Sequence, residues 1–391
     1  MGAVMKAVRF CFYFASIFIL FLLIVFAIGA DMSYMEMHDT VKNAITNRFS
    51  TLPNEEFFDR VYFDYLRLTG RRHFNGVTFL NDGRFMFDTQ NSNLFLQERA
   101  RSIIGLSGYL EKNGVPFLFV RTPSKIKDNS VIPRAFADNP IIENGETLMR
   151  LLKESNVDVL DLREKMNNAG FDYYNAFFNG DHHWTAETSL WALGQIGERV
   201  NRDYGFDIGG MSWDPGSYQH ITYKQVFLGE ESIAANALHN FEDVTFLIPK
   251  FETDITVTDL WVERMGVVAS GNFADVFTPK VNSGDNESFD YADFNSFFRY
   301  FFRYENTAAP EQKKVLLIAD SMGIPLATYF AATFETVDFM YLVYRQNDRI
   351  WQMIDENDYD FAVFILSDMS ISFEDAEHFE YDRFYFSPPP G

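Results

Sequence analysis

Five short, almost wholly apolar segments punctuate this 391-residue chain, and helix-like stretches separate them. The apolar segments are 115–120, 157–162, 315–319, 337–343 and 361–366, and the helix-like stretches are 94–113, 146–155, 323–334 and 346–357. A strand that is apolar on both sides is buried on both of its faces. The alternation therefore predicts an α/β core, with a parallel sheet and helices on both faces.

The alternation stops between residues 213 and 306, a region rich in Thr, Val, Phe, Gly and Asp. We interpret this region as a partly β insertion, and the aromatic stretch 289–304 at its end as a helix. The catalytic domain is predicted to span 75–391 and to open with a hairpin over 75–87, whose turn is an Asp-Gly pair. A helical stalk over 31–74 is expected to precede it.

An uncharged apolar run over residues 10–30 lies close to the N-terminus and is long enough to cross a bilayer as a helix. It exceeds the roughly 7–15 apolar residues of a cleaved signal peptide, so we expect a retained transmembrane signal-anchor over 1–30. Lys6 and Arg9 precede the run and Asp31 follows it, which predicts a cytoplasmic N-terminus. The remainder is therefore expected to be extracytoplasmic, in a single-pass protein of the cell membrane.

The composition excludes some classes of function. Lys and Arg number 33 against 55 Asp and Glu, a net charge of −22, so nucleic acid is not an expected partner. Cys11 is the only cysteine and lies inside the apolar run. A disulfide within the chain, a zinc site made of cysteines and a catalytic cysteine in the folded domain are therefore excluded.

Residues 181–185 read Asp-His-His-Trp-Thr and hold two of the seven histidines. Helical periodicity follows, with Thr185 in the position of an N-cap, so the motif is expected in a loop that enters a helix. In an extended loop, Asp181 and His183 point to the same side. The carboxylate can then accept the Nδ1 proton of His183 and leave Nε2 as a general base. The alternative is that such an Asp-x-His pair occurs by chance.

A nucleophile for that base is expected at Ser321, because the strand-like segment 315–319 ends there and a helix-like stretch follows. A serine at such a turn presents its hydroxyl above the carboxyl edge of the sheet, where α/β folds bind ligands. The backbone N–H groups of Ser321 and Gly323 are candidate donors to an oxyanion. The alternative is a serine that only caps the helix.

A metal site is the alternative to a site that uses the serine and the histidine. Asp181, His183 and Glu187, with His182 or His220, have side chains that ligate zinc. No HExxH pair on one helix face is present, so we expect neither a metal nor a cofactor.

The Asp-His-His-Trp-Thr motif, the aromatic run 173–178 before it and the Ile-Ala-Asp-Ser-Met-Gly segment at 318–323 resemble the DHHW family. That family is related to the alginate O-acetylation proteins in the SGNH hydrolase-like superfamily. The resemblance covers most of the chain from Asn75 onward, and residues 181–185 are its most specific part. It implies an SGNH hydrolase-like fold and a triad of Ser321, His183 and Asp181, whose order along the chain is reversed relative to ordinary SGNH esterases.

The resemblance also implies a function: a serine-dependent O-acetyltransferase that modifies hydroxyls of a cell-surface or secreted polysaccharide through an acyl-enzyme. The acetyl group would come from a multi-spanning membrane acyltransferase, the expected protein partner. Two alternatives stay open, namely a carbohydrate acetylesterase that uses the same site, and a non-catalytic glycan-binding or assembly subunit.

Four further side chains are candidates for substrate contact. Arg121 and Lys125 lie at the expected sheet edge and resemble a basic stretch of the alginate relatives, so they would meet an anionic glycan or fix a loop. His182 would contact substrate or orient its loop, and the alternative is a histidine that only packs or faces solvent. Trp184 would serve as a sugar platform or pack in the core.

Overall fold

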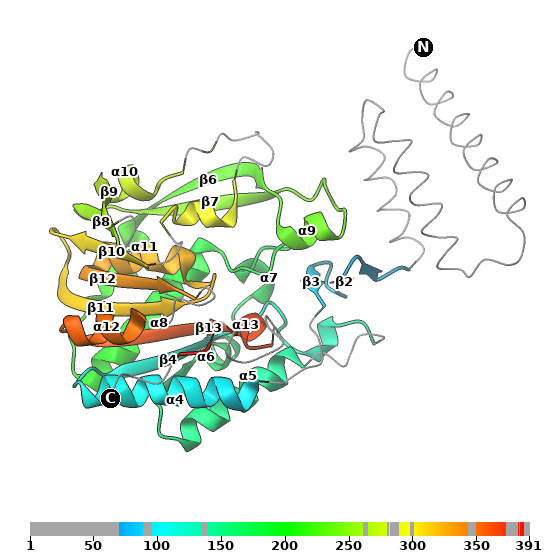
Figure 1. Ribbon diagram of the computed structural model, residues 1–391. Coiled ribbons are helices and arrows are strands. Elements are labelled where there is room, and N and C mark those ends of the chain that lie inside the picture. Colours follow the sequence, from blue (N-terminus) through cyan, green and yellow to red (C-terminus); the bar gives the residue numbers. More distant parts are fainter. Residues whose placement is uncertain are drawn as a thin grey trace, which may run out of the picture. The chain divides into compact units, whose positions relative to one another are not determined.

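The computed structural model (Figure 1) describes residues 70–88, 95–134, 140–260, 265–279, 281, 289–297, 301–342, 349–372, 382 and 384–386. The chain forms two compact units, Met1–Tyr62 and Phe63–Gly391, and all of these residues belong to the second. The predicted signal-anchor and the stalk up to residue 69 lie outside the described residues. Within the described ranges, no helix combines the length and the apolar character needed to span a membrane.

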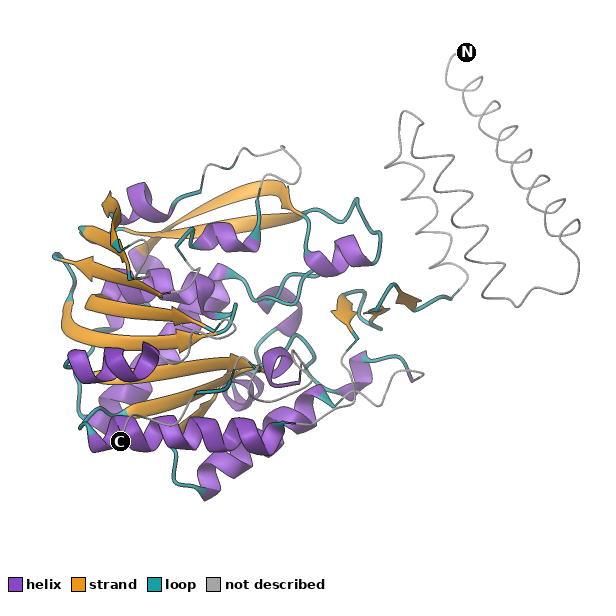
Figure 2. Ribbon diagram, in the orientation of Figure 1, coloured by secondary structure: helices purple, strands orange, loops and turns teal. Residues whose placement is uncertain are grey.

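An eight-stranded sheet forms the centre of the domain, in the order β5-β4-β13-β11-β12-β10-β8-β9 (Figures 1 and 2). Its strands are β4 (Phe117–Thr122), β5 (Val159–Asp161), β8 (Ile255–Asp259), β9 (Gly266–Gly271), β10 (Phe301–Asn306), β11 (Glu311–Ala319), β12 (Phe334–Tyr341) and β13 (Phe361–Ser367). The first five in this spatial order pair in parallel. They coincide with the five apolar segments, so the predicted parallel core is confirmed.

The other three strands, β10, β8 and β9, pair antiparallel and make the sheet mixed. The predicted insertion over 213–306 is therefore wrong in extent. Only β6 (Tyr218–Phe227) and β7 (Glu242–Pro249) form a separate two-stranded sheet. β8 resisted prediction because only alternate residues of it are buried, a weaker signal than a continuous apolar run.

The aromatic stretch 289–304 is not the predicted helix. It contains one short 3-10 helix, η5 (Tyr291–Phe294), and the first residues of β10. In β10, Phe301 packs in the core on one face of the sheet, whereas Phe302 and Tyr304 pack in the core on the other. Aromatic side chains suit a strand that is buried on both faces, which explains the error.

Helices cover both faces of the sheet, as predicted (Figure 2). The α-helices of the described residues are α4 (Leu96–Lys112), α5 (Ile141–Glu154), α6 (Leu162–Asn168), α7 (Tyr173–Ala176), α8 (Ala186–Tyr204), α9 (Glu230–Ala234), α10 (Phe273–Phe277), α11 (Gly323–Thr333), α12 (Arg349–Glu356) and α13 (Asp368–Ser372), and not all of them lie on the sheet. One core joins α8 and α11 to the sheet, and a second core joins α4, α5 and α12 to it. Leu118 and Phe119, neighbours in β4, belong to different cores.

The domain opens with a small sheet of β1 (His73–Phe74), β2 (Val77–Phe79) and β3 (Phe85–Phe87). β2 and β3 pair antiparallel around Gly83, whose φ of 95° explains the glycine in that turn, so the predicted hairpin is confirmed. Residues 70–74 form a turn and β1, so the expected helical stalk is wrong over its last five residues.

Candidate active site

The segment 181–185 lies in a loop that folds back on α7 before α8 begins. Phe178 N donates to His183 O at 3.1 Å, and Thr185 N donates to Ala176 O at 3.0 Å. The side chain of Thr185 accepts from Thr188 N and caps α8, as predicted. The loop is therefore pinned at both of its ends.

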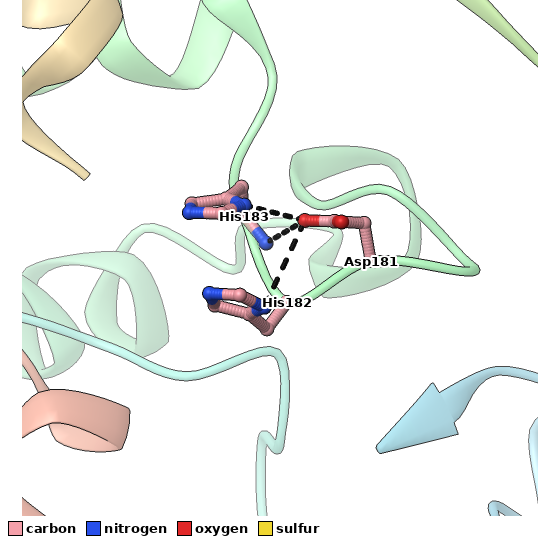
Figure 3. A group of neighbouring side chains, drawn as sticks. All are labelled: Asp181, His182 and His183. Carbon is pink, nitrogen blue, oxygen red and sulfur yellow. Dashed lines mark hydrogen bonds and ion pairs between the residues drawn. The ribbon is translucent and has the colours of Figure 1, made fainter. Parts of the chain in front are cut away.

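Asp181 and His183 form a buried pair (Figure 3). His183 Nδ1 lies 2.5 Å from Asp181 Oδ1, and His183 N donates to the same oxygen at 3.0 Å. Oδ2 accepts from Glu230 N, the first residue of α9, at 2.9 Å. Because a carboxylate only accepts hydrogen bonds, Nδ1 carries the proton and Nε2 is the basic nitrogen.

The charge state of Asp181 is set by opposing effects. Burial raises the pKa of its carboxyl, but the charge and hydrogen bond of His183 outweigh burial and hold the pKa below its ordinary value. Asp181 is therefore a carboxylate at neutral pH, and its negative charge can stabilise positive charge that develops on the imidazole during proton transfer.

Two rings pack against the imidazole of His183, and its second nitrogen, Nε2, is buried. The ring centroids of His182 and Tyr291 both lie 3.8 Å from that of His183, and Tyr291 is nearly parallel to it, at 12°. Nε2 is buried and has no hydrogen-bond partner among the residues that the structure describes. This is the atom that the sequence predicts as the general base.

His182 packs against His183 and is mostly buried. Burial, followed by the neighbouring His183, lowers the pKa of His182 to about 3. His182 is therefore neutral at pH 7 and adds no positive charge beside an imidazolium at His183. These contacts fit the orienting role and the packed role that the sequence leaves open for this residue.

Ser321 is partly exposed in a tight turn between β11 and α11. Buried Asp320 fixes the turn: Oδ1 accepts from Met322 N at 3.0 Å, and Oδ2 accepts from the N and Oγ of Ser367 at 2.8 and 2.7 Å. A Cβ on Gly323 would lie 2.2 Å from Ala319 Cβ, so only glycine fits. A serine is thus held above the carboxyl end of β11, as expected.

The two backbone N–H groups expected to bind an oxyanion differ in whether they already have an acceptor. Gly323 N donates to Asp320 O at 2.9 Å and is committed to the turn, which corrects the expectation for Gly323. Ser321 N has no acceptor within the described ranges. One of the two donors is therefore available to a ligand.

A direct contact connects the histidine loop to the serine turn. Trp184 is fully buried, and its Nε1 donates to Met322 O at 3.0 Å. The residue after His183 is thus bonded to the residue after Ser321. Trp184 has the packing role, and its burial rules out the sugar platform.

Arg121 lies at the sheet edge as expected, but it is buried and its donors are occupied. Nε donates to Asp368 Oδ1 at 2.6 Å, Nη1 to Asp161 Oδ2 at 3.1 Å and Nη2 to Ile142 O at 3.2 Å. These bonds hold the ends of β4, β5 and β13 together. Arg121 therefore has a structural role, and the expectation of a glycan contact is corrected.

Lys125 is also buried, and it fixes the histidine loop. Its Nζ donates to the backbone oxygens of Asp181, Asn179 and Phe178 at 2.8, 3.0 and 3.3 Å, and pairs with the carboxylate of Glu231 in α9. With its hydrogens spent on protein oxygens, Lys125 supports the loop instead of meeting an anionic glycan.

The sequence does not predict several residues of the site, and all of them come from the region 213–306. Glu242, in β7, accepts from Asn179 N at 2.6 Å and Gly180 N at 2.8 Å. Glu230 and Tyr291 contact Asp181 and His183 as described above. None of these residues belongs to a motif, so the sequence held no local signal for them.

Only some of the residues proposed as zinc ligands lie close enough together to bind a metal ion. Asp181, His182 and His183 each have a ligating atom within 4.8 Å of the others, and no further group of this kind occurs among the described residues. Glu187 and His220 lie outside that group, and His220 contacts Pro215 O at 3.3 Å. Both oxygens of Asp181 already accept hydrogen bonds from N–H groups, and this argues against a role as a metal ligand.

Comparison with known proteins finds one family model and several solved structures that resemble this chain. Residues 79–211, which include the Asp181–Thr185 motif and end before Ser321, match the model of the SGNH hydrolase-like domain of acetyltransferase AlgX. No curated protein matches the sequence. PatB1 of Bacillus cereus, solved with a sulfonyl adduct, superposes with a TM-score of 0.60 at 17% identity, covering 79% of this chain and 97% of PatB1.

Two further solved structures are similar. A DHHW family protein from Eubacterium siraeum has a TM-score of 0.53 at 16% identity, covering 78% of this chain and 95% of its own. The O-acetyltransferase domain of Pseudomonas putida AlgJ has a TM-score of 0.46 at 12% identity, with coverages of 77% and 94%. PatB1 and the DHHW protein share the fold of this chain. Residues 79–211 therefore match the SGNH hydrolase-like domain of AlgX, as the predicted resemblance to the alginate O-acetylation proteins expects, and the DHHW protein has the same fold as this chain.

Proposed function

We propose that this protein is an O-acetyltransferase that acetylates hydroxyls of a polysaccharide through a triad of Ser321, His183 and Asp181. The observation that carries the proposal is the buried Asp181–His183 pair, whose unpaired Nε2 belongs to a loop bonded to the Ser321 turn through Trp184. The match to the AlgX acetyltransferase model supports acetyl transfer as the chemistry.

The reaction has two halves. In the first, His183 Nε2 takes the proton of Ser321 Oγ while Oγ forms a bond to the acetyl carbonyl carbon. Asp181 stabilises the resulting imidazolium, which returns the proton to the leaving oxygen of the donor. In the second half, a sugar hydroxyl loses its proton to His183 and attacks the acetyl-serine, and Ser321 regains its proton from His183.

The location and partners are part of the proposal. Residues 1–30 would anchor the protein in the cell membrane, with the domain outside the cytoplasm, where cell-surface and secreted polysaccharides are found. A multi-spanning membrane acyltransferase would deliver the acetyl group across the membrane. The net charge of −22 is consistent with an acceptor other than nucleic acid.

The test is acetyl-ester turnover by the full chain in detergent, with Ser321→Ala as the variant. Activity should fall by at least about 10³-fold, because the nucleophile is lost. Ser155→Ala, which changes an exposed serine at the end of α5, should keep full activity. Equal activity of wild type and Ser321→Ala would refute the serine mechanism, and activity removed by a chelator would favour the metal alternative.

The same assay with an added oligosaccharide separates the enzyme classes. A transferase accumulates the acetylated sugar, whereas an acetylesterase releases acetate at an unchanged rate. Wild-type protein that binds the sugar and turns over no ester would match the non-catalytic alternative.

A further inference from the structure

Tyr291 lies in the centre of the site without belonging to any motif. It begins η5, whose backbone is fixed by a capping box: Asp290 accepts from Ala292 N at 2.8 Å, and Asp293 accepts from Asp290 N at 2.9 Å. The side chain is 4% exposed. The position of Tyr291 is thus set by the local chain before any ligand binds.

Aromatic contacts fix the plane of its ring. The ring stacks on His183 at 3.8 Å and 12°, and the rings of Phe178 and Phe294 meet it edge-on at 6.3 and 5.4 Å. The ring therefore cannot turn away from the imidazole without disturbing the core. The phenol oxygen, which is in the ring plane, is fixed as well.

The hydroxyl of Tyr291 is buried, and its O–H proton has no acceptor in the described part of the chain, because the one side chain that approaches its oxygen, Trp184, can only donate. Two other buried tyrosines have acceptors for their hydroxyl protons: Tyr218 donates to Ser212 O at 2.5 Å, and Tyr304 donates to Phe297 O at 3.1 Å. A buried polar group without a partner is costly, and one beside a catalytic histidine calls for a partner that a ligand supplies.

Tyr291 also lies beside the serine turn. η5 packs against α11, which begins two residues after Ser321. Burial, followed by the charges of Asp181 and Asp320, raises the pKa of Tyr291. Its oxygen therefore keeps a proton and is a hydrogen-bond donor at neutral pH.

The proposed reaction needs such a donor. Attack by Ser321 Oγ forms a C–O bond, and the π electrons of the acetyl carbonyl move to its oxygen, which becomes negatively charged. Of the two backbone donors expected there, Gly323 N is already paired. We propose that the Tyr291 hydroxyl donates the second hydrogen bond to this oxygen, beside Ser321 N. Tyr291 keeps its proton throughout, and the hydrogen bond weakens as the C=O bond re-forms.

This inference rests on the proposed function, and its test uses three variants of the full chain in detergent, assayed with a small acetyl ester. Tyr291→Phe keeps the ring on His183 and removes only the hydroxyl. It should lower kcat by about 10²–10³-fold, with KM and the pH dependence of kcat little changed, because one oxyanion donor is lost.

Tyr173→Phe is the matched control. Tyr173 is also buried with an unpaired hydroxyl, but its ring stacks on Phe177 at 6.0 Å and is not stacked on His183. This variant should keep kcat within about twofold, because the charges that act on its hydroxyl are those of Arg163 and Asp368, and not those of the histidine loop and the serine turn. Equal losses in the two tyrosine variants would mean a general packing defect and overturn the inference.

Ser321→Ala separates the two proposals. If Ser321→Ala is inactive and Tyr291→Phe keeps wild-type kcat, the triad stands and the role of Tyr291 is refuted. If Ser321→Ala keeps wild-type activity, the proposed function fails and the oxyanion role fails with it. A shift in KM alone for Tyr291→Phe would also overturn the inference, since an oxyanion donor acts on the transition state.

Discussion

The side chains around His183 leave a single route for its proton. Nδ1 is held by Asp181, and the rings of His182 and Tyr291 pack 3.8 Å from the imidazole. Nε2 alone lacks a protein partner within the described residues. Proton exchange with a reacting hydroxyl is thereby restricted to this one nitrogen, which is what a general base that serves two half-reactions requires.

At the same scale, His182 predicts a pH dependence of stability. Its pKa is about 3 in the fold and about 6.5 in an unfolded chain, so the unfolded state binds more protons between these values. Above about pH 6.5, His182 is neutral in both states and does not reduce the free energy of unfolding. As the pH falls toward 3, the unfolded state gains a proton that the folded state does not bind, and the free energy of unfolding decreases. The wild type should therefore lose more thermal stability between pH 7 and pH 5 than His182→Gln does.

The measurement is the melting temperature of both proteins at the two pH values. Comparing the two proteins cancels the other titrating groups, including Glu231, whose pKa is raised to about 7 chiefly by burial. Identical changes in wild type and His182→Gln would show that folding does not lower the pKa of His182.

At the scale of elements, two chain segments support the histidine loop. Lys125, three residues after β4, donates to the loop and pairs with Glu231 of α9. The start of α9 is pressed onto the loop, since a Cβ on Gly229 would lie 2.2 Å from Gly180 O and 2.5 Å from Asp181 Cβ. α9 therefore acts as a support that holds the carboxylate of Asp181 toward His183.

This support can be broken at the Lys125–Glu231 pair. Lys125→Met leaves the Glu231 carboxylate buried without its cation, and should cost about 3–5 kcal/mol of unfolding free energy. It should also lower kcat, because the loop loses three backbone contacts. Denaturant unfolding checks the first effect, and ester turnover the second.

Lys127→Met, which changes an exposed lysine two residues away, is the control and should leave stability unchanged. Lys125→Met combined with Glu231→Gln should recover part of the loss, because the uncompensated charge is gone. A Lys125→Met protein as stable as the wild type would contradict the supporting role.

At the scale of the whole molecule, the parallel strands can be predicted from the sequence, whereas the long-range contacts of the site cannot. The five parallel strands were predictable because each is a continuous apolar run, and with them came the turn that holds Ser321. The supports of the site were not predictable. The bonds of Asp181 to Glu230 and of Gly180 to Glu242 span 49 and 62 positions, and they depend on how residues 213–306 fold against the core. In that region, the aromatic pattern of β10 is also typical of a buried helix, and the sequence therefore does not predict that Tyr291 stacks on His183.

The acyl-enzyme is the species that this account requires. The full chain would be mixed with a small acetyl ester, quenched in acid during turnover, digested and mapped by mass spectrometry. The expected result is one acetyl group on Ser321 in the wild type and none in Ser321→Ala. Turnover without any acetylated residue, or with the acetyl group on another side chain, would contradict the mechanism.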